Sequence, residues 1–278
     1  MCPKDEKQAR QAACAEHTRL LRVSGALWAN KTLGRASSDP VVFSQATRRM
    51  PDGSEDLCQS NAPGALEIAL AHTRAGAEAI RRGGGLFGAT QLAAECEALR
   101  RWAEQAGCLK VFEAISRPPD AFGYEHEVWF PQADGAESRV MKATYGNCFG
   151  HLPDGSEASP AGYLERLVLC NEVLGDQISL LGVEECRPGV IRVVTAQPAV
   201  QGHPAEVHEI TQFFESSGFQ RRQWGRNSVW FRAADGIIAS DTHGGNVLRT
   251  RDGALVAIDV PLMVWKEGMS PLTTANGV

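Results

Sequence analysis

The chain has 278 residues and a formal net charge of −5, and 43% of its residues are hydrophobic while 22% are charged. This balance is typical of a globular protein and excludes a fibrous or wholly disordered one. The negative charge argues against a dedicated nucleic-acid binder, because such proteins carry a basic surplus that neutralises phosphates. No run of 18 apolar residues occurs, so we expect no membrane segment and a cytoplasmic location.

The N-terminal part of the chain predicts helices. Residues 4–22 favour a helix, and residues 32–63 are rich in turn-forming residues without sustained periodicity, which predicts a loose linker. Apolar residues then recur at helical spacing in Ala65–Arg82 and in Ala89–Ala106. Gly83–Gly85 lies between these segments, after a helix rather than a strand and without the Gly-Lys-Ser/Thr of a phosphate loop. We therefore predict a helical hairpin with a glycine hinge.

Short strand-like segments separated by turn signals begin after Gly107. Two hairpins are predicted: Tyr124–Phe130 with Arg139–Thr144 about Asp134-Gly135, and Ile178–Val183 with Val190–Thr195 about Arg187-Pro188-Gly189. One helix separates them, since Ser159 suits an N-cap, Pro160 the first helical position and Gly175 the end. The order is therefore two strands, a helix and two strands.

A further helix and four strands are predicted downstream. The helix covers about Pro204–Ser217, where the apolar residues share one face. The strands are Ser228–Arg232 with Ile237–Ala239, and Asn246–Thr250 with Ala254–Val260, each pair joined at an Asp-Gly turn. The basic cluster formed by Arg221, Arg222 and Arg226 around Trp224 is assigned to a surface loop, and the last 18 residues show no clear element.

The last predicted hairpin carries the most informative polar residues. If Asp252-Gly253 forms a type I′ turn, Asn246 and Asp259 are directly opposed, with their Cβ atoms about 5 Å apart. An amide oxygen and a carboxylate suit a Mg²⁺ that takes its other ligands from water and substrate phosphates. Asp241 stands five residues before Asn246, where a loop can direct its side chain to the same site.

Lys142 is the second informative feature. It is the only lysine of residues 111–265, and it lies in an apolar strand. The capped helix that follows carries Glu165 near its middle, and such a carboxylate keeps a lysine charged and extended for contact with a triphosphate. Glu127 is an alternative partner, because the predicted register of the first hairpin places it opposite Lys142.

A strand Lys, a helix Glu, a loop Asp with an Asn five residues later, and an Asp after a hairpin occur here in the order typical of protein kinases. The loop Asp241–Asn246 resembles the Asp-x-His-x-x-Asn loop of aminoglycoside and choline phosphotransferases. From about Leu109 to Val264 the chain further resembles the kinase-like domain of the polyvalent proteins of phages and conjugative elements. The motifs that carry this resemblance are Val140–Thr144, Phe149-Gly150, Tyr163–Leu167, Asn171 with Gly175-Asp176, Ala196–Pro198, Asp241–Asn246 and Ile258–Val260.

The resemblance implies an α+β, two-lobed, kinase-like fold that uses ATP and Mg²⁺ to phosphorylate a protein or small-molecule hydroxyl. It also implies residue roles: Lys142 holds the α- and β-phosphates, Glu165 pairs with Lys142, Asp241 accepts or orients the acceptor hydroxyl, Asn246 and Asp259 hold the metal, and Ala196, Gln197 and Pro198 lie beside adenine. His243 is expected to hold the loop through hydrogen bonds.

Two features depart from the usual kinase pattern. A single glycine occurs in Pro118–Glu125, where a glycine-rich loop is expected, and only 19 residues follow Asp259, which implies a truncated C-lobe. The alternative function is therefore a pseudokinase or interaction module that binds nucleotide or a protein partner without catalysis. The expected parts are an N-terminal helix and linker at 1–64, the helical hairpin at 65–107, the kinase-like domain at 108–265 and a tail at 266–278.

Overall fold

The computed structural model describes residues 64–82, 90–112, 115–131, 138–152, 156–267, 269 and 271–274. The expected helix at 4–22, the linker at 32–63, the hinge Gly83–Gly85 and the turn Asp134-Gly135 lie outside the described residues.

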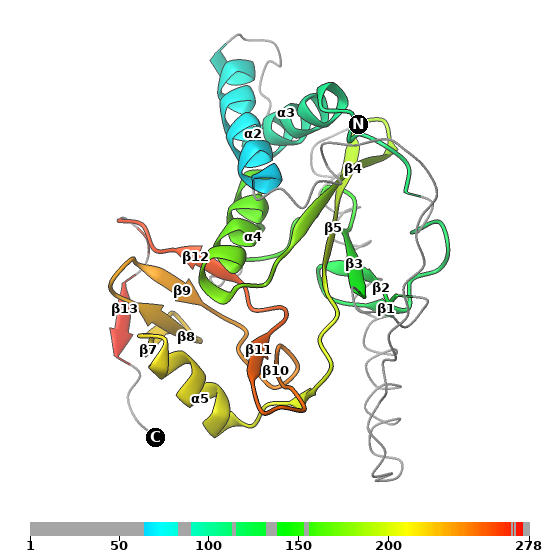
Figure 1. Ribbon diagram of the computed structural model, residues 1–278. Helices are drawn as coiled ribbons and strands as arrows, with labels where there is room; N and C mark the ends of the chain where they lie inside the picture. Colours follow the sequence, from blue (N-terminus) through cyan, green and yellow to red (C-terminus); the bar gives the residue numbers. More distant parts are fainter. Residues whose placement is uncertain are drawn as a thin grey trace. The chain divides into compact units, whose positions relative to one another are not determined.

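Two helices form the predicted hairpin arms, α2 (Ala65–Arg82) and α3 (Gln91–Gln105). The first has the predicted bounds, and the second begins after Thr90, whose hydroxyl accepts a hydrogen bond from the amide of Ala93 at 3.3 Å. Both helices pack against α4 (Pro160–Leu174), as Figure 1 shows. They share one buried apolar cluster with it, so their association is stabilised by the same hydrophobic core.

Helix α4 is defined by local signals that the sequence carries. The Ser159 hydroxyl accepts a hydrogen bond from the amide of Gly162 at 3.2 Å, and Pro160 occupies the first turn. Gly175 ends the helix with φ +72°, a left-handed conformation that glycine adopts without a steric penalty. The predicted helix between the two hairpins is therefore confirmed.

A five-stranded antiparallel sheet, in the order β1-β2-β3-β5-β4, precedes and follows α4 in the chain. Its strands are β1 (Ala121–Phe122), β2 (His126–Trp129), β3 (Arg139–Thr144), β4 (Ser179–Arg187) and β5 (Val190–Pro198). Both predicted hairpins are present, and β4 and β5 run longer than expected.

The register of β2 and β3 differs by one residue from the prediction. Lys142 is opposite Val128, and Glu127 is opposite Ala143. A slip of one residue turns a side chain to the other face of the sheet, and the Glu127 carboxylate binds Arg192 at 2.9 Å. The prediction that Glu127 could pair with Lys142 is therefore wrong.

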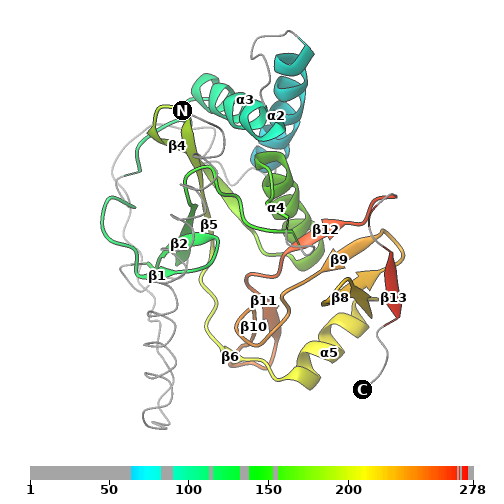
Figure 2. The same cartoon turned by 180° about the vertical axis from the view of Figure 1, so that it is seen from behind.

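The next part of the chain forms a small three-stranded sheet and a helix. The sheet has the order β11-β10-β6, with β6 (His203–Pro204), β10 (Val247–Arg249) and β11 (Leu255–Ala257). Helix α5 (Val207–Ser216) begins three residues later than predicted, because Glu209 accepts a hydrogen bond from the Glu206 amide at 2.8 Å and so holds the helix start. It lies against β11 in both views (Figures 1 and 2).

A second five-stranded antiparallel sheet has the order β12-β9-β8-β7-β13. Its strands are β7 (Gln220–Trp224), β8 (Asn227–Arg232), β9 (Ile237–Ala239), β12 (Leu262–Val264) and β13 (Leu272–Thr274). Two expectations are corrected here. Arg221, Arg222 and Trp224 lie in strand β7 rather than in a loop, and only Arg226 lies in the turn before β8. The last 18 residues supply two strands, because β12 and β13 find partners in β9 and β7. Strand β12 also contacts α4, which joins this sheet to the helical layer.

The expected mixture of helices and antiparallel sheets is confirmed. The largest apolar cluster unites α2, α3, α4, β4, β5, α5 and β8. None of the described helices has the length and apolarity that crossing a bilayer requires.

Candidate active site

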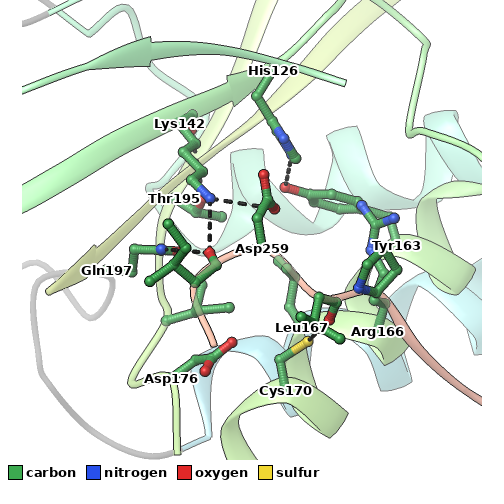
Figure 3. A pocket seen from close by; sticks show the side chains of 14 residues that line it. His126, Lys142, Tyr163, Arg166, Leu167, Cys170, Asp176, Thr195, Gln197 and Asp259 are labelled. Carbon is green, nitrogen blue, oxygen red and sulfur yellow. Dashed lines mark hydrogen bonds and ion pairs between the residues drawn. The ribbon is translucent and has the colours of Figure 1, made fainter. Parts of the chain in front are cut away.

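A cavity of about 30 Å³ lies where the first sheet, α4 and the segment Ile258–Pro261 meet. Figure 3 shows the side chains that line it. This volume corresponds to about one water molecule. Its walls nevertheless carry cations and carboxylates from parts of the chain far apart in sequence, which makes it the best candidate for an active site.

Lys142 projects from β3 into this cavity. Its Nζ atom lies 3.4 Å from Oδ1 of Asp259 and donates a hydrogen bond to the carbonyl oxygen of Ile258 at 3.2 Å. The Gln197 amide nitrogen donates to the same carbonyl at 2.9 Å. The Lys142 side chain is only 12% exposed, so its charge is compensated by Asp259 rather than by solvent.

Asp259 follows β11 and faces both the cavity and solvent, with 54% of its side chain exposed. Partial burial tends to raise the pKa of this carboxyl, but the neighbouring positive charges, above all that of Lys142, lower it below its ordinary value. Asp259 is therefore an ionised carboxylate at neutral pH, as a metal ligand must be.

The loop Asp241–Asn246 forms a compact unit of hydrogen bonds. The side-chain nitrogen Nδ2 of Asn246 donates to Oδ2 of Asp241 at 3.0 Å and to the backbone carbonyl oxygen of Asp241 at 2.9 Å. His243 Nδ1 accepts from the Gly245 amide at 2.9 Å, so His243 holds the loop as expected. Asp241 has φ +51°, a left-handed conformation that is uncommon outside glycine, although Asp and Asn adopt it more readily than other residues.

The expected direct opposition of Asn246 and Asp259 is not formed. Val247 is opposite Ala257, and the Ile258 amide donates to the Asn246 carbonyl at 2.9 Å. The reason is the turn, because a three-residue loop ending at Gly253, with φ +88°, replaces the assumed two-residue turn and shifts the register by one.

A backbone hydrogen bond nevertheless joins the two segments. The Ser240 amide donates to the carbonyl oxygen of Pro261 at 3.1 Å. The residue before Asp241 is thus tied to the segment that carries Asp259. The Asp241–Asn246 loop is therefore joined to the segment of Asp259 through the backbone, but neither Asp241 nor Asn246 lines the cavity.

Glu165 does not take the place that the resemblance implies. Its carboxylate lies 2.8 Å from Arg74 of α2 and 3.8 Å from Lys266. On α4 it points to a different side from the residues that line the cavity, since side chains one position apart on a helix diverge by about 100°. The expected ion pair between Lys142 and Glu165 is therefore replaced by the pair between Lys142 and Asp259.

The face of α4 that does line the cavity presents Tyr163 and Arg166, which sequence reasoning did not single out as site residues. Arg166 pairs with Glu125 at 2.6 Å, and the two side chains are 8% and 18% exposed. His126 Nε2 and the Tyr163 hydroxyl share a hydrogen bond of 2.9 Å. Burial lowers the pKa of His126 to about 4, so this histidine is neutral at pH 7. The signal available in the sequence was an arginine within the largely apolar segment 163–170 of the helix.

Asp176, which belongs to one of the motifs that carry the family resemblance, also lines the cavity. Its Oδ1 atom is buried and has no hydrogen-bond partner among the described residues. Burial raises the pKa of Asp176 to about 7, with Asp259 adding to the increase and Lys142 opposing it. The next residue, Gln177, also has a left-handed backbone, with φ +53°.

The three residues expected beside adenine occupy the end of β5. Gln197 lines the cavity, whereas Ala196 is buried between Met141 and Ser179 of the neighbouring strands, and Pro198 is opposite Arg139. The Ala196 carbonyl accepts a hydrogen bond from Arg139 at 2.9 Å. Of these three residues, only Gln197 presents its side chain to the cavity.

No curated protein and no solved structure matches the chain. Residues 93–265, more than half of the chain, match the family described as serine/threonine/tyrosine kinases found in polyvalent proteins. The matched range contains Lys142, Asp241, Asn246 and Asp259. The chain therefore belongs to the kinase family of the polyvalent proteins, and is in general terms a kinase-like phosphotransferase.

Proposed function

We propose that the chain, with Mg²⁺ as cofactor, transfers the γ-phosphoryl group of ATP to a hydroxyl group of a protein or small molecule. The observation that carries this proposal is the ion pair between Lys142 and Asp259 at the cavity. Lys142 also donates a hydrogen bond to Ile258, which precedes Asp259 and is 116 residues away from Lys142 in the sequence. The segment between Lys142 and Asp259 carries the Asp241–Asn246 loop, so lysine, loop aspartate and second aspartate follow one another in the order typical of kinases.

The available oxygen atoms suit Mg²⁺. Asp259 offers a carboxylate. Asn246, which lies opposite Ile258 rather than Asp259, directs its side-chain nitrogen to Asp241, so its side-chain oxygen remains available to a metal. Among the described residues, no group of three or more His, Cys, Asp and Glu could hold a metal by itself. A Mg²⁺ bound to one or two of these protein oxygens would take its remaining ligands from substrate phosphates and water. When bound, the metal supplies charge neutralisation at the phosphates.

Two residues of the chain then carry the transfer. Lys142 holds the phosphates of the nucleotide by charge, and Asp241, with its side chain 62% exposed, is open to an acceptor hydroxyl. The acceptor oxygen forms a bond to the γ-phosphorus, the bond between this phosphorus and the β,γ-bridging oxygen breaks, and Asp241 accepts the hydroxyl proton. Most of the rate enhancement comes from positioning and electrostatic stabilisation, as in other phosphoryl transfers.

The small cavity limits how a nucleotide can bind. A volume of about 30 Å³ holds no nucleotide. The phosphates therefore approach Asp259 from its exposed side. Lys142 and Gln197 both donate to the Ile258 carbonyl, so contacts of either side chain with the nucleotide would compete with these hydrogen bonds.

The test combines binding and transfer. Thermal shift with ATP, with and without Mg²⁺, measures binding, because a ligand that binds only the folded chain raises the melting temperature. Incubation with γ-labelled ATP measures transfer. We expect a Mg²⁺-dependent shift that Asp259→Asn reduces, and label transfer to the chain or to an added hydroxyl acceptor. A shift without transfer would favour the non-catalytic interaction module, and absence of both would overturn the proposal.

A further inference from the structure

We propose that Trp230 of β8 is a positioning residue that orients Asp241 through the neighbouring Thr242. This inference rests on the proposed function. It assigns to the second five-stranded sheet a part in the reaction: this sheet fixes the loop that carries Asp241.

The contact is a single side-chain hydrogen bond between two elements. The indole Nε1 of Trp230 donates to the hydroxyl oxygen of Thr242 at 3.0 Å. Thr242 directly follows Asp241 in the chain. A displacement of Thr242 therefore alters the backbone angles of Asp241 and the direction of its carboxylate.

Trp230 is itself held rigidly. Its side chain is 3% exposed, and its ring stacks on that of Phe214 in α5, with centroids 5.3 Å apart and planes inclined by 16°. Phe214 is fully buried and meets Phe219 edge to face at 5.5 Å. The guanidinium of Arg221 lies 5.6 Å from the centroid of the Trp230 ring. An indole confined in this way directs its N–H group to one fixed point.

The loop needs an external contact of this kind. Its internal hydrogen bonds, such as those from Asn246 to Asp241 and from Gly245 to His243, give it a shape but do not orient it relative to the cavity. Asp241 is left-handed, a conformation that Asp adopts more readily than most other residues, and the hydrogen bonds around it support that conformation. On one side of Asp241 the Ser240 amide is bonded to Pro261, and on the other side Thr242 is bonded to Trp230. Together these two bonds fix the backbone on both sides of Asp241.

A second tryptophan of the same sheet shows what packing alone looks like. Trp224 of β7 is also 3% exposed, but its indole nitrogen is buried without a hydrogen-bond partner among the described residues. Trp224 thus contributes apolar contacts to the sheet and no contact to the loop. Trp224→Phe is therefore the matched control for Trp230→Phe.

The experiment compares four variants: Thr242→Val, Thr242→Ser, Trp230→Phe and Trp224→Phe. Thr242→Val and Trp230→Phe remove one partner of the hydrogen bond while keeping a similar shape, and we expect kcat to fall about 10- to 100-fold with the Kd of ATP changed less than about twofold. Thr242→Ser keeps the hydroxyl and should restore kcat to within about threefold of the wild type. Trp224→Phe should leave kcat within about twofold, which excludes a general effect of losing an indole from the sheet.

Hydrogen exchange gives a readout that needs no activity. The amides of His243, Gly245, Asn246 and Val247 are hydrogen-bonded within the loop, so their exchange reports how firmly it is held. We expect faster exchange across residues 241–247 in Thr242→Val and Trp230→Phe but not in Trp224→Phe.

The outcomes separate the two proposals. If Thr242→Val keeps both wild-type kcat and wild-type exchange, the positioning role of Trp230 is wrong. If the wild type itself transfers no phosphoryl group, the proposed function fails, and hydrogen exchange still decides about Trp230: faster exchange confined to the two loop variants supports the contact, and equal exchange in all variants overturns it.

Discussion

The two halves of the candidate site are held in place by different means. Lys142 and Asp259 meet between the first sheet and α4, where Lys142 is 12% exposed and its charge is paired. Asp241 is 62% exposed and owes its place to backbone conformation and hydrogen bonds within a loop. Burial makes the first half sensitive to any uncompensated charge, whereas the second half can lose a side chain without loss of core packing. Substitutions should therefore separate stability from turnover.

The largest expected effect lies in the exposed half. Asp241→Ala removes the group that accepts the hydroxyl proton, so turnover should fall about 10²- to 10⁴-fold. The Kd of ATP should stay close to that of the wild type, because the side chain is exposed. The free energy of unfolding should fall by about 1 kcal/mol, since Ala is disfavoured at φ +51° and the Asn246 bond is lost. Steady-state transfer with γ-labelled ATP and a thermal melt measure turnover and stability. Asp252→Ala, in the exposed turn that follows, is the control and should leave turnover unchanged. Wild-type turnover in Asp241→Ala would break the comparison.

The next effect concerns stability in the buried half. Arg166→Met leaves the Glu125 carboxylate buried without its partner, which should lower the free energy of unfolding by about 3–5 kcal/mol. Arg74→Met breaks the more exposed pair with Glu165 and should cost less than about 1 kcal/mol. Urea unfolding of both variants measures the difference. Equal losses would show that burial does not distinguish the two faces of α4.

A smaller effect is expected in the pH dependence of stability. The pKa of Asp176 is raised from its ordinary value of 3.8 to about 7. Between these values the unfolded chain has lost this proton while the folded chain keeps it, so stability falls as pH rises through the window. Asp176→Asn removes this loss. The free energy of unfolding of the variant minus that of the wild type should therefore be about 1–3 kcal/mol more positive at pH 8 than at pH 4.

His126 titrates with the opposite sign. Its lowered pKa means that stability falls as pH drops from 6.5 toward about 4. Because both the wild type and Asp176→Asn contain His126, this contribution cancels in their difference. Urea unfolding at pH 4 and pH 8 provides the measurement, and a difference that is the same at both pH values would contradict the ionisation assigned to Asp176.

The smallest effect sharpens the assignment of the lysine partner. Glu165→Gln should change the Kd of ATP and kcat by less than about twofold, because its carboxylate faces Arg74 and Lys266 rather than Lys142. Lys142→Met should weaken ATP binding by about tenfold or more, since a phosphate contact is lost. Isothermal titration with ATP and Mg²⁺ compares them. A loss in Glu165→Gln as large as that in Lys142→Met would restore Glu165 as the functional partner.

The sequence by itself determined the elements whose signals act within one turn of chain. The cap at Ser159, the proline after it and the glycine at residue 175 specify the ends of α4 through hydrogen bonds and backbone angles of adjacent residues. The two hairpins of the first sheet and the loop from Asp241 to Asn246 were also predictable, because Gly, Asp and Asn impose their turn chemistry locally.

Tertiary structure alone decided which side chains meet. Glu127 and Asn246 were each misplaced by a register shift of one residue, and such a shift depends on the conformation of the turn and on pairing across strands. Strands β7, β12 and β13 have weak patterns of their own and exist because partner strands satisfy their backbone groups. Lys142 pairs with Asp259 rather than with Glu165 because of the face that α4 turns inward. The whole hydrophobic core determines this face through contacts between residues far apart in sequence, and no local signal encodes it.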